Sequence, residues 1–450
     1  MRSTCFLASG LLVVATLGLA TVGRAQAPAR AAAAVPDAFQ AKAIVALSDA
    51  DMVPSAYVDD KLGPPAGTDV LSVVRFDGRR VAPVSMQTLP ISNSVTGPPA
   101  AVATTPDGRY AITIETRGPR TSSSAGGTLT GLPNGRLISV VDLADLRHPR
   151  VVQQVLGPRR AVGVSVSADG TLVALAVHPA GDGTAAPLWL YRFGRGRLSG
   201  GAAVPIPDWT AGDELVTAVF HPSRPLLALT NKTKNQLLLA SVQAVGAGWQ
   251  LARWGNAVAI ESGNLLTCFS PDGRFVFANG GPASPAPNER QHGWVLSVRL
   301  DAHPGTAAEP THELVSRAPT GYIPEGLAVS PDGRLLVTTN LEQTFQPVGS
   351  AQRGRYASLT LLAIDPASGA LTSAGDFAFD GMLPESAVFD ASSRRLAVAN
   401  FGHLDDLLAS GSLDFWRVVG APTGPEPLRL VKTAYALPLQ RGVHTLSVVR

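Results

Sequence analysis

Short runs of β-branched and aliphatic residues recur along this chain, and tight-turn sequences separate them. The clearest turn is Ser/Thr-Pro-Asp-Gly-Arg, which is followed by an apolar run at 105–116, 270–280 and 330–340. In such a turn proline presets the first corner, aspartate bonds to local backbone and glycine accepts a positive φ. Because apolar residues lie on both sides of the turn, each copy predicts a β-hairpin.

Weaker copies of this hairpin lie at 167–178, 221–231 and 390–400, so the phrase repeats every 49–62 residues. A third apolar run follows each hairpin, as at 135–143 and 357–365, and a weaker fourth run completes the unit. Four antiparallel strands repeated at this period are typical of a β-propeller.

The two ends of the chain complete the count of blades. Residues 69–77 look like a third strand without a hairpin before it, and residues 443–449 look like the first strand that is missing. We therefore expect an all-β, seven-bladed propeller whose C-terminal strand joins the N-terminal strands from about 42–89. Such a closure removes exposed sheet edges. A six-bladed ring with an N-terminal appendage is the alternative.

The N-terminus predicts export. Arg2, an apolar stretch and Ala25-Gln26-Ala27 have the form of a signal peptide over residues 1–27. We expect a disordered, Ala-rich lead-in at 28–41 and a single propeller domain at 42–450. No later apolar run approaches the roughly 20 residues that span a bilayer. The interpretation is a monomeric periplasmic or secreted protein without an integral membrane span.

Composition excludes some partners. The formal net charge is only +3 at pH 7, so nothing indicates binding to nucleic acid. One cysteine remains after the expected cleavage, and the protein must therefore hold together without an internal disulfide.

In a ring of blades, equivalent sequence positions lie side by side on one face, which predicts a candidate site. The start of each first strand and the end of each second strand open on the same face. Six residues before the motif proline, blades five to seven carry Glu325, Glu385 and, by the closure alignment, His444, whereas the other blades are apolar there. We expect a small-molecule ligand or a protein partner at this face, where long loops often carry function. The second-strand ends add Glu115, His178, Asn231, Asn279, Asn340 and Asn400, with His403 just beyond.

Each candidate also has a structural interpretation. Asparagine at a strand end often forms a turn, a Pro-Glu pair could simply begin a strand, and His444 could be a hydrogen-bonded wall residue. As functional groups, two neighbouring carboxylates could hold a divalent cation, divide into acid and base, or bind a cationic or polyhydroxylated ligand. No metalloprotease, nucleophile-elbow, P-loop or dinucleotide-binding motif is present to choose among them.

The Ser-Pro-Asp-Gly-Arg phrases and the strand LTLLAIDPASGAL at 359–371 resemble the YVTN-type repeat. Over about 40–450 the chain is similar to the lactonase-like seven-bladed propellers, which include 6-phosphogluconolactonases and muconate-lactonising enzymes. Gly157-Pro158-Arg159-Arg160 is similar to a Gly-Pro-Arg-His stretch of the lactonase branch, with Arg160 in the histidine place. This is a departure from the lactonase pattern; in a hydrolase, a fixed cation at Arg160 would stabilise a developing oxyanion.

Two functional hypotheses follow. The first is an exported lactonase-like hydrolase that processes a small lactone, ester or sugar acid at the mouth of blades five to seven. Glu325 or Glu385 would be general base or metal ligand there, and His444 the proton partner or a ligand. The second is a non-catalytic binding module, which predicts exposed aromatic residues on the long loops, such as Phe345 and Tyr356.

Overall fold

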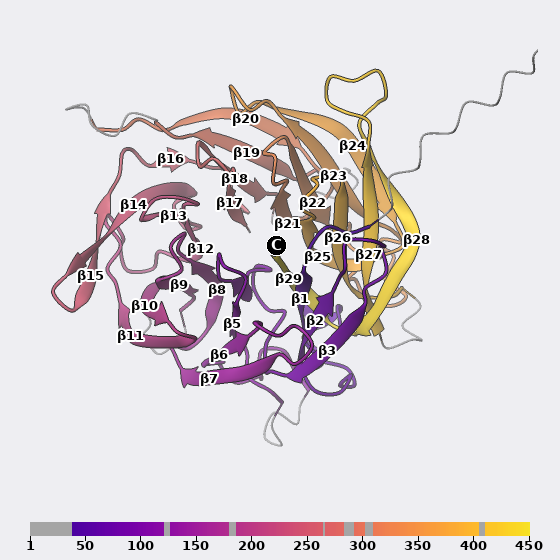
Figure 1. The fold of residues 1–450 in the computed structure, drawn as a ribbon, viewed down its shortest axis with the longest axis horizontal. Coiled ribbons are helices and arrows are strands. Elements are labelled where there is room, and N and C mark those ends of the chain that lie inside the picture. Colours follow the sequence, from indigo (N-terminus) through magenta and orange to yellow (C-terminus); the bar gives the residue numbers. More distant parts are fainter. Residues whose placement is uncertain are drawn as a thin grey trace, which may run out of the picture. The chain divides into compact units, whose positions relative to one another are not determined.

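Seven antiparallel sheets surround a common axis (Figure 1). The computed structural model describes residues 38–120, 127–179, 186–263, 266–282, 292–301, 309–404 and 410–450. Across these ranges the sheets are the seven four-stranded blades that the repeat predicts, and blade three carries one additional two-residue strand.

Blades one to six each use strands that are consecutive in sequence, with the first strand innermost. Blade one is β4 (Val102–Thr104), β5 (Tyr110–Ile114), β6 (Leu137–Asp142) and β7 (Arg150–Leu156). Blade two is β8 (Ala161–Val166), β9 (Leu172–Val177), β10 (Leu188–Gly194) and β11 (Arg197–Ala203). Blade three is β12 (Leu215–Phe220), β13 (Leu226–Asn231), β14 (Gln236–Val245) and β15 (Gly248–Arg253), with β16 (Val258–Ala259) beside β14.

The next three blades follow the same plan. Blade four is β17 (Thr267–Phe269), β18 (Phe275–Gly280), β19 (Trp294–Arg299) and β20 (Glu313–Pro319). Blade five is β21 (Pro324–Val329), β22 (Leu335–Asn340), β23 (Ala357–Ile364) and β24 (Leu371–Phe379). Blade six is β25 (Met382–Phe389), β26 (Arg395–Gly402), β27 (Ser410–Val419) and β28 (Arg429–Gln440).

Blade seven is built from both ends of the chain, as predicted. Its strand order is β29 (Val443–Val449), β1 (Ala43–Ser48), β2 (Val70–Arg75) and β3 (Ser85–Pro90). β29 pairs antiparallel with β1 and contacts the innermost strands β25 and β4 of its two neighbouring blades. The C-terminal strand therefore closes the ring.

The repeated turn forms for the chemical reasons that its sequence suggests. In blade four Ser270 Oγ donates to Asp272 Oδ1 at 2.6 Å and accepts from the backbone N–H of Phe275 at 3.0 Å. Gly273 has a φ of +73°, which favours glycine. Blade five repeats this arrangement at Ser330 and Asp332.

An aromatic cluster seals blade seven against blade six. The ring of Phe39 lies 5.0 Å from that of Phe76 and 5.6 Å from that of Phe415, measured between centroids. Phe39 is fully buried, and the backbone N–H of Gln40 donates to Asp390 Oδ2 at 3.0 Å. Residues 38–41, expected in the lead-in, are thus packed against the ring, and the expected signal peptide lies outside the described residues.

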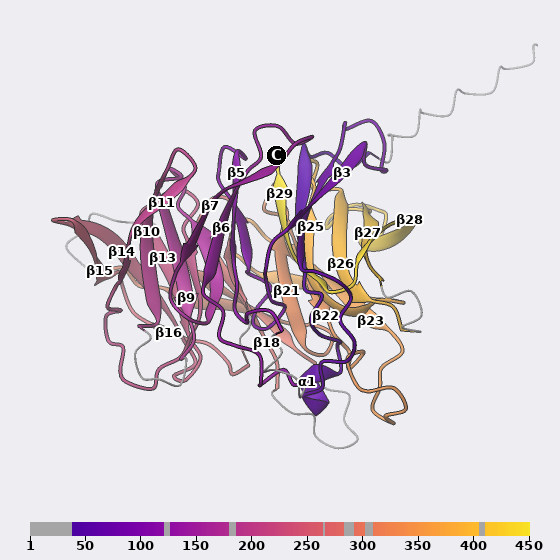
Figure 2. The same ribbon diagram turned by 90° about the horizontal axis from the view of Figure 1, so that it is seen from below.

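The two faces of the ring differ (Figure 2). The short helix α1 (Ala56–Asp59) lies on one face, which we call the loop face, and the C-terminus points to the opposite face, which we call the turn face because it carries the Pro-Asp-Gly turns. No helix among the described residues is long and apolar enough to cross a bilayer.

Ending the chain after Gln440 should destabilise the protein severely. The deletion removes β29, whose Val443, Leu446 and Val449 side chains are buried. The loss of their burial lowers the unfolding free energy by about 5–9 kcal/mol. Urea unfolding followed by circular dichroism measures the loss. In the matched control, Ser447→Ala, we expect a change within about 1 kcal/mol. A truncated chain with the stability of the parent would contradict closure by this strand.

Candidate functional site

Bulges at the start of two innermost strands aim Glu325 and Glu385. In blade five the backbone of Pro324 pairs with Asn340, but Gly326 already pairs with Thr339, so Glu325 is the extra residue. Blade six repeats the irregularity, and Glu385 is its extra residue. Bulges of this kind redirect a side chain out of the sheet pattern. The two glutamates therefore occupy equivalent places on adjacent strands, as the repeat predicts.

A left-handed residue precedes each bulge. Ile323 has a φ of +51° and Leu383 a φ of +48°, a conformation that costs non-glycine residues free energy and that clusters at functional sites. Arg160 enters β8 in the same way with a φ of +58°. In blade seven the corresponding residue is Gly442, where a Cβ would collide with the carbonyl oxygen of Asp49. The repeated left-handed step sets the direction of entry into the inner strand.

Glu385 is the most unusual carboxyl group of the site. The residue is 0% exposed, and neither carboxylate oxygen has a hydrogen-bond partner in the described part of the chain. Burial raises the pKa of Glu385 well above its ordinary value, and the charges of Glu325 and Asp49 raise it further. A buried, unpartnered carboxylate is costly, so the side chain needs a proton or a cation.

Glu325 shares this environment. It is 9% exposed, and burial raises its pKa to about 8. Because the two carboxyl groups interact, protons leave the pair in steps that belong to both residues. Since the charge of Glu325 raises the pKa of Glu385, Glu325 ionises first and can act as a base beside a Glu385 that keeps its proton.

The segment between β1 and β2 covers the loop face beside the two glutamates. Met52, Ala56 and Leu62 of this segment form one apolar cluster with Met382 and Leu383, the residues that lead to Glu385. The Tyr57 residue is 38% exposed, but its hydroxyl donates to a backbone carbonyl oxygen at 3.0 Å. Burial raises the pKa of Tyr57, and the charges of Glu385, Glu325 and Asp49 add to the effect. The charges of all three carboxyl groups therefore act on the Tyr57 hydroxyl.

Two buried aspartates anchor this covering segment. The backbone N–H of Val95 donates to Asp49 Oδ2 at 2.9 Å, and that of Ala50 donates to Asp69 Oδ1 at 2.8 Å. Burial raises the pKa of Asp69 to about 8, with the Asp49 charge as the next cause. Burial also raises the pKa of Asp49 to about 6.

The pattern analysis missed Asp49, Asp69 and Tyr57, because the 49–69 segment contains no repeat to align. The available signal was the position of Asp49 directly after the second strand of blade seven, where other blades carry polar residues. Asp69 likewise directly precedes β2.

His444 lies beside the covering segment with both ring nitrogens in use. Nε2 is 2.9 Å from Asn93 Oδ1, and Nδ1 is 2.9 Å from the hydroxyl of Thr445. The amide nitrogen of Asn93 donates to two backbone carbonyl groups, so its oxygen must accept from Nε2–H of a neutral histidine. Burial lowers the pKa of His444 to about 3. Its expected role as proton partner stays a prediction, and the geometry favours an anchor for Asn93.

Several second-strand residues have structural partners. Asn279 donates to the carbonyl oxygens of Pro324 and Glu325, which braces the bulge of the next blade. Asn340 donates to the hydroxyls of Ser358 and Thr360, at 2.9 Å each. Their expected ligand-binding roles stay predictions.

Three more of these residues also bond within the fold. Glu115 accepts from the Ser92 hydroxyl and from the backbone N–H groups of Arg136 and Leu137. Asn231 caps the turn at Lys234. Asn400 donates to Ser412, whereas its buried Oδ1 has no partner among the described residues.

The remaining candidates lie on other parts of the loop face. Burial lowers the pKa of His178 to about 4, and its Nε2 lies 3.4 Å from Glu214 Oε1. Arg160 donates to the carbonyl oxygen of Pro179 and is close enough to His178 to act on its charge. His403 is half-buried after β26. Within the described residues Arg160 makes no hydrogen bond or ion pair with Glu325 or Glu385, so its oxyanion role stays a prediction.

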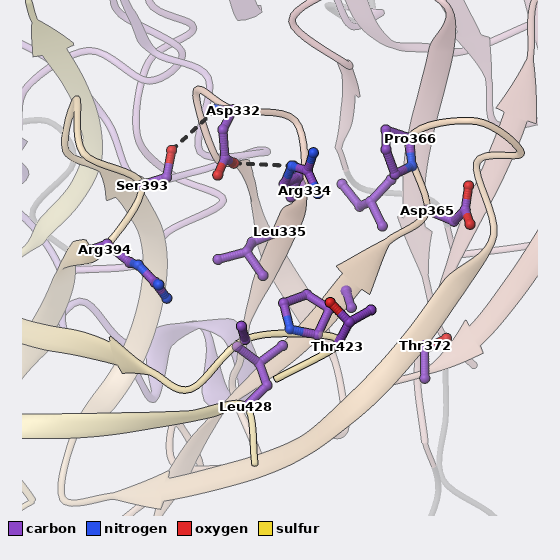
Figure 3. Close-up of a pocket in the computed structure, with 14 residues that line it drawn as sticks. Asp332, Arg334, Leu335, Asp365, Pro366, Thr372, Ser393, Arg394, Thr423 and Leu428 are labelled. Carbon is purple, nitrogen blue, oxygen red and sulfur yellow. Dashed lines mark hydrogen bonds between the residues drawn. The ribbon is translucent and has the colours of Figure 1, made fainter. Parts of the chain in front are cut away.

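Two cavities bear on the location of the site. One of about 250 Å³ lies between the innermost strands and is lined by Leu327, Ser386 and Leu446; Ser386 follows Glu385 in the chain, but neither glutamate lines the cavity. A larger pocket of about 440 Å³ lies on the turn face, where Asp332 and Arg394 line it (Figure 3). The larger pocket contains none of the predicted site residues. Of these two cavities, only the smaller one includes a chain neighbour of a predicted site residue.

Solved structures share this architecture. A proposed 6-phosphogluconolactonase of Bacteroides uniformis aligns with a TM-score of 0.58 and 15% identity, over 91% of this chain and 100% of its own. A proposed 6-phosphogluconolactonase of Bacteroides fragilis gives 0.56 and 12%, over 91% and 98%. The periplasmic gluconolactonase of Pseudomonas aeruginosa gives 0.57 and 18%, over 90% and 99%.

The chain has the fold of the lactonase-like seven-bladed propellers. The resemblance in the repeat is thus confirmed at the level of fold. No family model matches the sequence, and no curated protein matches it.

Stability should fall as the pH rises, in the absence of divalent cations. The pKa of Asp69 is about 8 in the folded protein against an ordinary value of 3.8, so the folded state holds an extra proton between about pH 4 and 8. Because the folded state binds this extra proton, the unfolding free energy falls by at most about 1.4 kcal/mol for each unit that the pH rises within that window. Asp69→Asn should have a shallower slope in urea unfolding at pH 5–9 with EDTA. Equal slopes in parent and variant would refute the raised pKa; the exposed Glu309→Gln is the control.

Replacing His444 should test its structural role. His444→Ala leaves the Asn93 amide oxygen without its donor and should cost about 1–3 kcal/mol of unfolding free energy, in addition to the cavity. His444→Gln, whose amide can donate, should recover part of that loss. Urea unfolding of both variants measures the effect, and parental stability in His444→Ala would contradict it.

Proposed function

We propose that the protein is an exported lactonase-like hydrolase that opens a small lactone or ester beside Glu325 and Glu385. The observation that carries the proposal is the pair of buried carboxyl groups on adjacent bulges, with Glu385 unpartnered among the described residues. A lactonase fold supports the reaction class. The signal peptide expected at residues 1–27, and a periplasmic gluconolactonase among the structural neighbours, support export.

Hydrolysis needs one proton acceptor and one proton donor. In the proposed step the ionised carboxylate takes a proton from water as the water oxygen bonds to the carbonyl carbon. The protonated carboxyl group gives its proton to the ring oxygen as the carbon–oxygen bond breaks. The product is a hydroxy acid, and proton exchange within the pair restores the starting state. Positioned acid–base groups of this kind contribute about 10²–10⁴ in rate.

The environment of the pair suits this chemistry. The covering segment keeps water away from the glutamates, and interactions between charges are stronger where water is excluded. The cavity of about 250 Å³ between the innermost strands is smaller than a typical drug-sized pocket and suits a small substrate. Its lining includes Ser386 and Arg450, which could bind polar groups of that substrate.

The decisive experiment is a pH-indicator screen of the purified protein against aliphatic, aromatic and sugar lactones, with and without EDTA. Glu325→Gln and Glu385→Gln should each lower kcat by about 10²-fold or more, because the amide neither gives nor takes a proton. The exposed Glu309→Gln should keep parental turnover. Because the pKa of Glu325 is about 8 and the charge of Glu325 raises the pKa of Glu385 further, turnover should rise as the pH approaches 8, where Glu325 ionises while Glu385 keeps its proton.

Absence of turnover on every lactone would contradict the hydrolase and favour a binding module. One observation supports that second function: Tyr356 is 60% exposed and Val348 79% exposed on the same loop-face segment. Phe345, expected to be exposed as well, instead packs against the apolar cluster of the covering segment.

A further inference from the structure

Three aspartates of the covering segment converge. Asp49, Asp51 and Asp69 each present a carboxylate oxygen, and these oxygens lie within 4.8 Å of one another. Asp49 and Asp69 are buried and Asp51 is half-buried. We call this group the aspartate triad. The repeat pattern gives no role to it.

The triad is held in place by the backbone. Asp49 accepts from the N–H of Asp51 at 2.7 Å, and Asp69 accepts from that of Asn93 at 3.1 Å. A carboxylate has about four lone-pair sites, so each group keeps acceptor capacity after these bonds. Asp51 also lies 3.5 Å from the Arg120 guanidinium. One guanidinium against three carboxylates leaves negative charge at the triad.

Glu385 supplies an independent sign that a cation is needed here. Its carboxylate is wholly buried without a partner among the described residues, and the charge of Asp49 acts on it. Both residues are next to groups that bond at or beside β29. The N–H of Asp49 donates to the carbonyl oxygen of Gly442, directly before β29, and the N–H of Leu446 in β29 donates to the hydroxyl of Ser386, the residue after Glu385. A buried carboxylate that other negative charges act on is stabilised by a cation nearby.

We propose that the aspartate triad binds a calcium ion. Every ligand is a carboxylate oxygen, which suits a hard cation rather than zinc or copper. Two oxygens on one calcium ion are separated by at most twice the bond length, about 4.6–5.2 Å, so triad oxygens that lie within 4.8 Å of one another can share one ion. Calcium also accepts irregular ligand directions, whereas magnesium demands a near-ideal octahedron.

Such an ion would tie the covering segment to the ring. Asp49 and Asp69 mark the two ends of that segment, so one cation would join them and stabilise the cover over Glu325 and Glu385. The inference concerns binding and does not rest on hydrolysis. A failure to find turnover would therefore leave it standing, and a failure to bind calcium would leave the hydrolase standing.

Isothermal titration calorimetry of the purified, EDTA-treated protein with calcium chloride tests the site directly. We expect one ion per chain and a higher melting temperature when calcium is present. Magnesium chloride should bind at least about tenfold more weakly, given the ligand geometry. No heat and no melting shift up to about 10 mM calcium, where even weak extracellular calcium sites are filled, would overturn the proposal, as would tighter binding of magnesium.

Variants locate the ion. Asp69→Asn and Asp51→Asn should each weaken calcium binding by about tenfold or more, because each removes a charged ligand. Asp51 is half-buried, so its variant should fold even if Asp69→Asn does not. Glu385→Gln should weaken binding less, and Glu309→Gln should leave it unchanged. Parental affinity in both aspartate variants would place any bound calcium elsewhere and overturn the assignment.

Discussion

The pairing of β29 with β1 is the constraint on which the rest of the molecule depends. Without it the ring would present two open edges, each with unpaired backbone groups. The pairing also determines the site, because it brings β1 and the C-terminal strand β29 into one blade. Asp49 leaves β1 beside Gly442, and the following segment must then run across the loop face to reach β2. Closure of the ring and covering of the mouth thus have one cause.

The site gathers features that cost free energy. Left-handed Ile323 and Leu383, two bulges and several buried carboxyl groups all lie within blades five to seven. A chain can retain such features when the surrounding packing is extensive, and seven sheets supply that packing. The four Pro-Asp-Gly-type turns on the other face, by contrast, satisfy their own polar groups locally and carry no comparable burden.

Similarity to solved propellers bears on the fold more than on the chemistry. The structural neighbours share 12–18% identity with this chain, a level at which the ring persists while sites diverge. The aspartates between β1 and β2 belong to a connection and lie outside the repeat. A connection can change without disturbing the ring, so the features that distinguish one propeller from another are expected there.

The sequence by itself determined the ring: the period of the turns, the third strands and the C-terminal closing strand all follow from local hydrophobic and turn patterns. It also aligned Glu325 with Glu385, because both have the same offset from a motif proline. Only the tertiary structure decided which polar groups are satisfied. Asn279 and Asn340 look alike in the repeat, yet one braces a neighbouring bulge and the other bonds hydroxyls of its own blade. Asp49 and Tyr57 reach the glutamates through a connection whose path no local pattern encodes, since contacts between distant segments, and not periodicity, set the course of a loop.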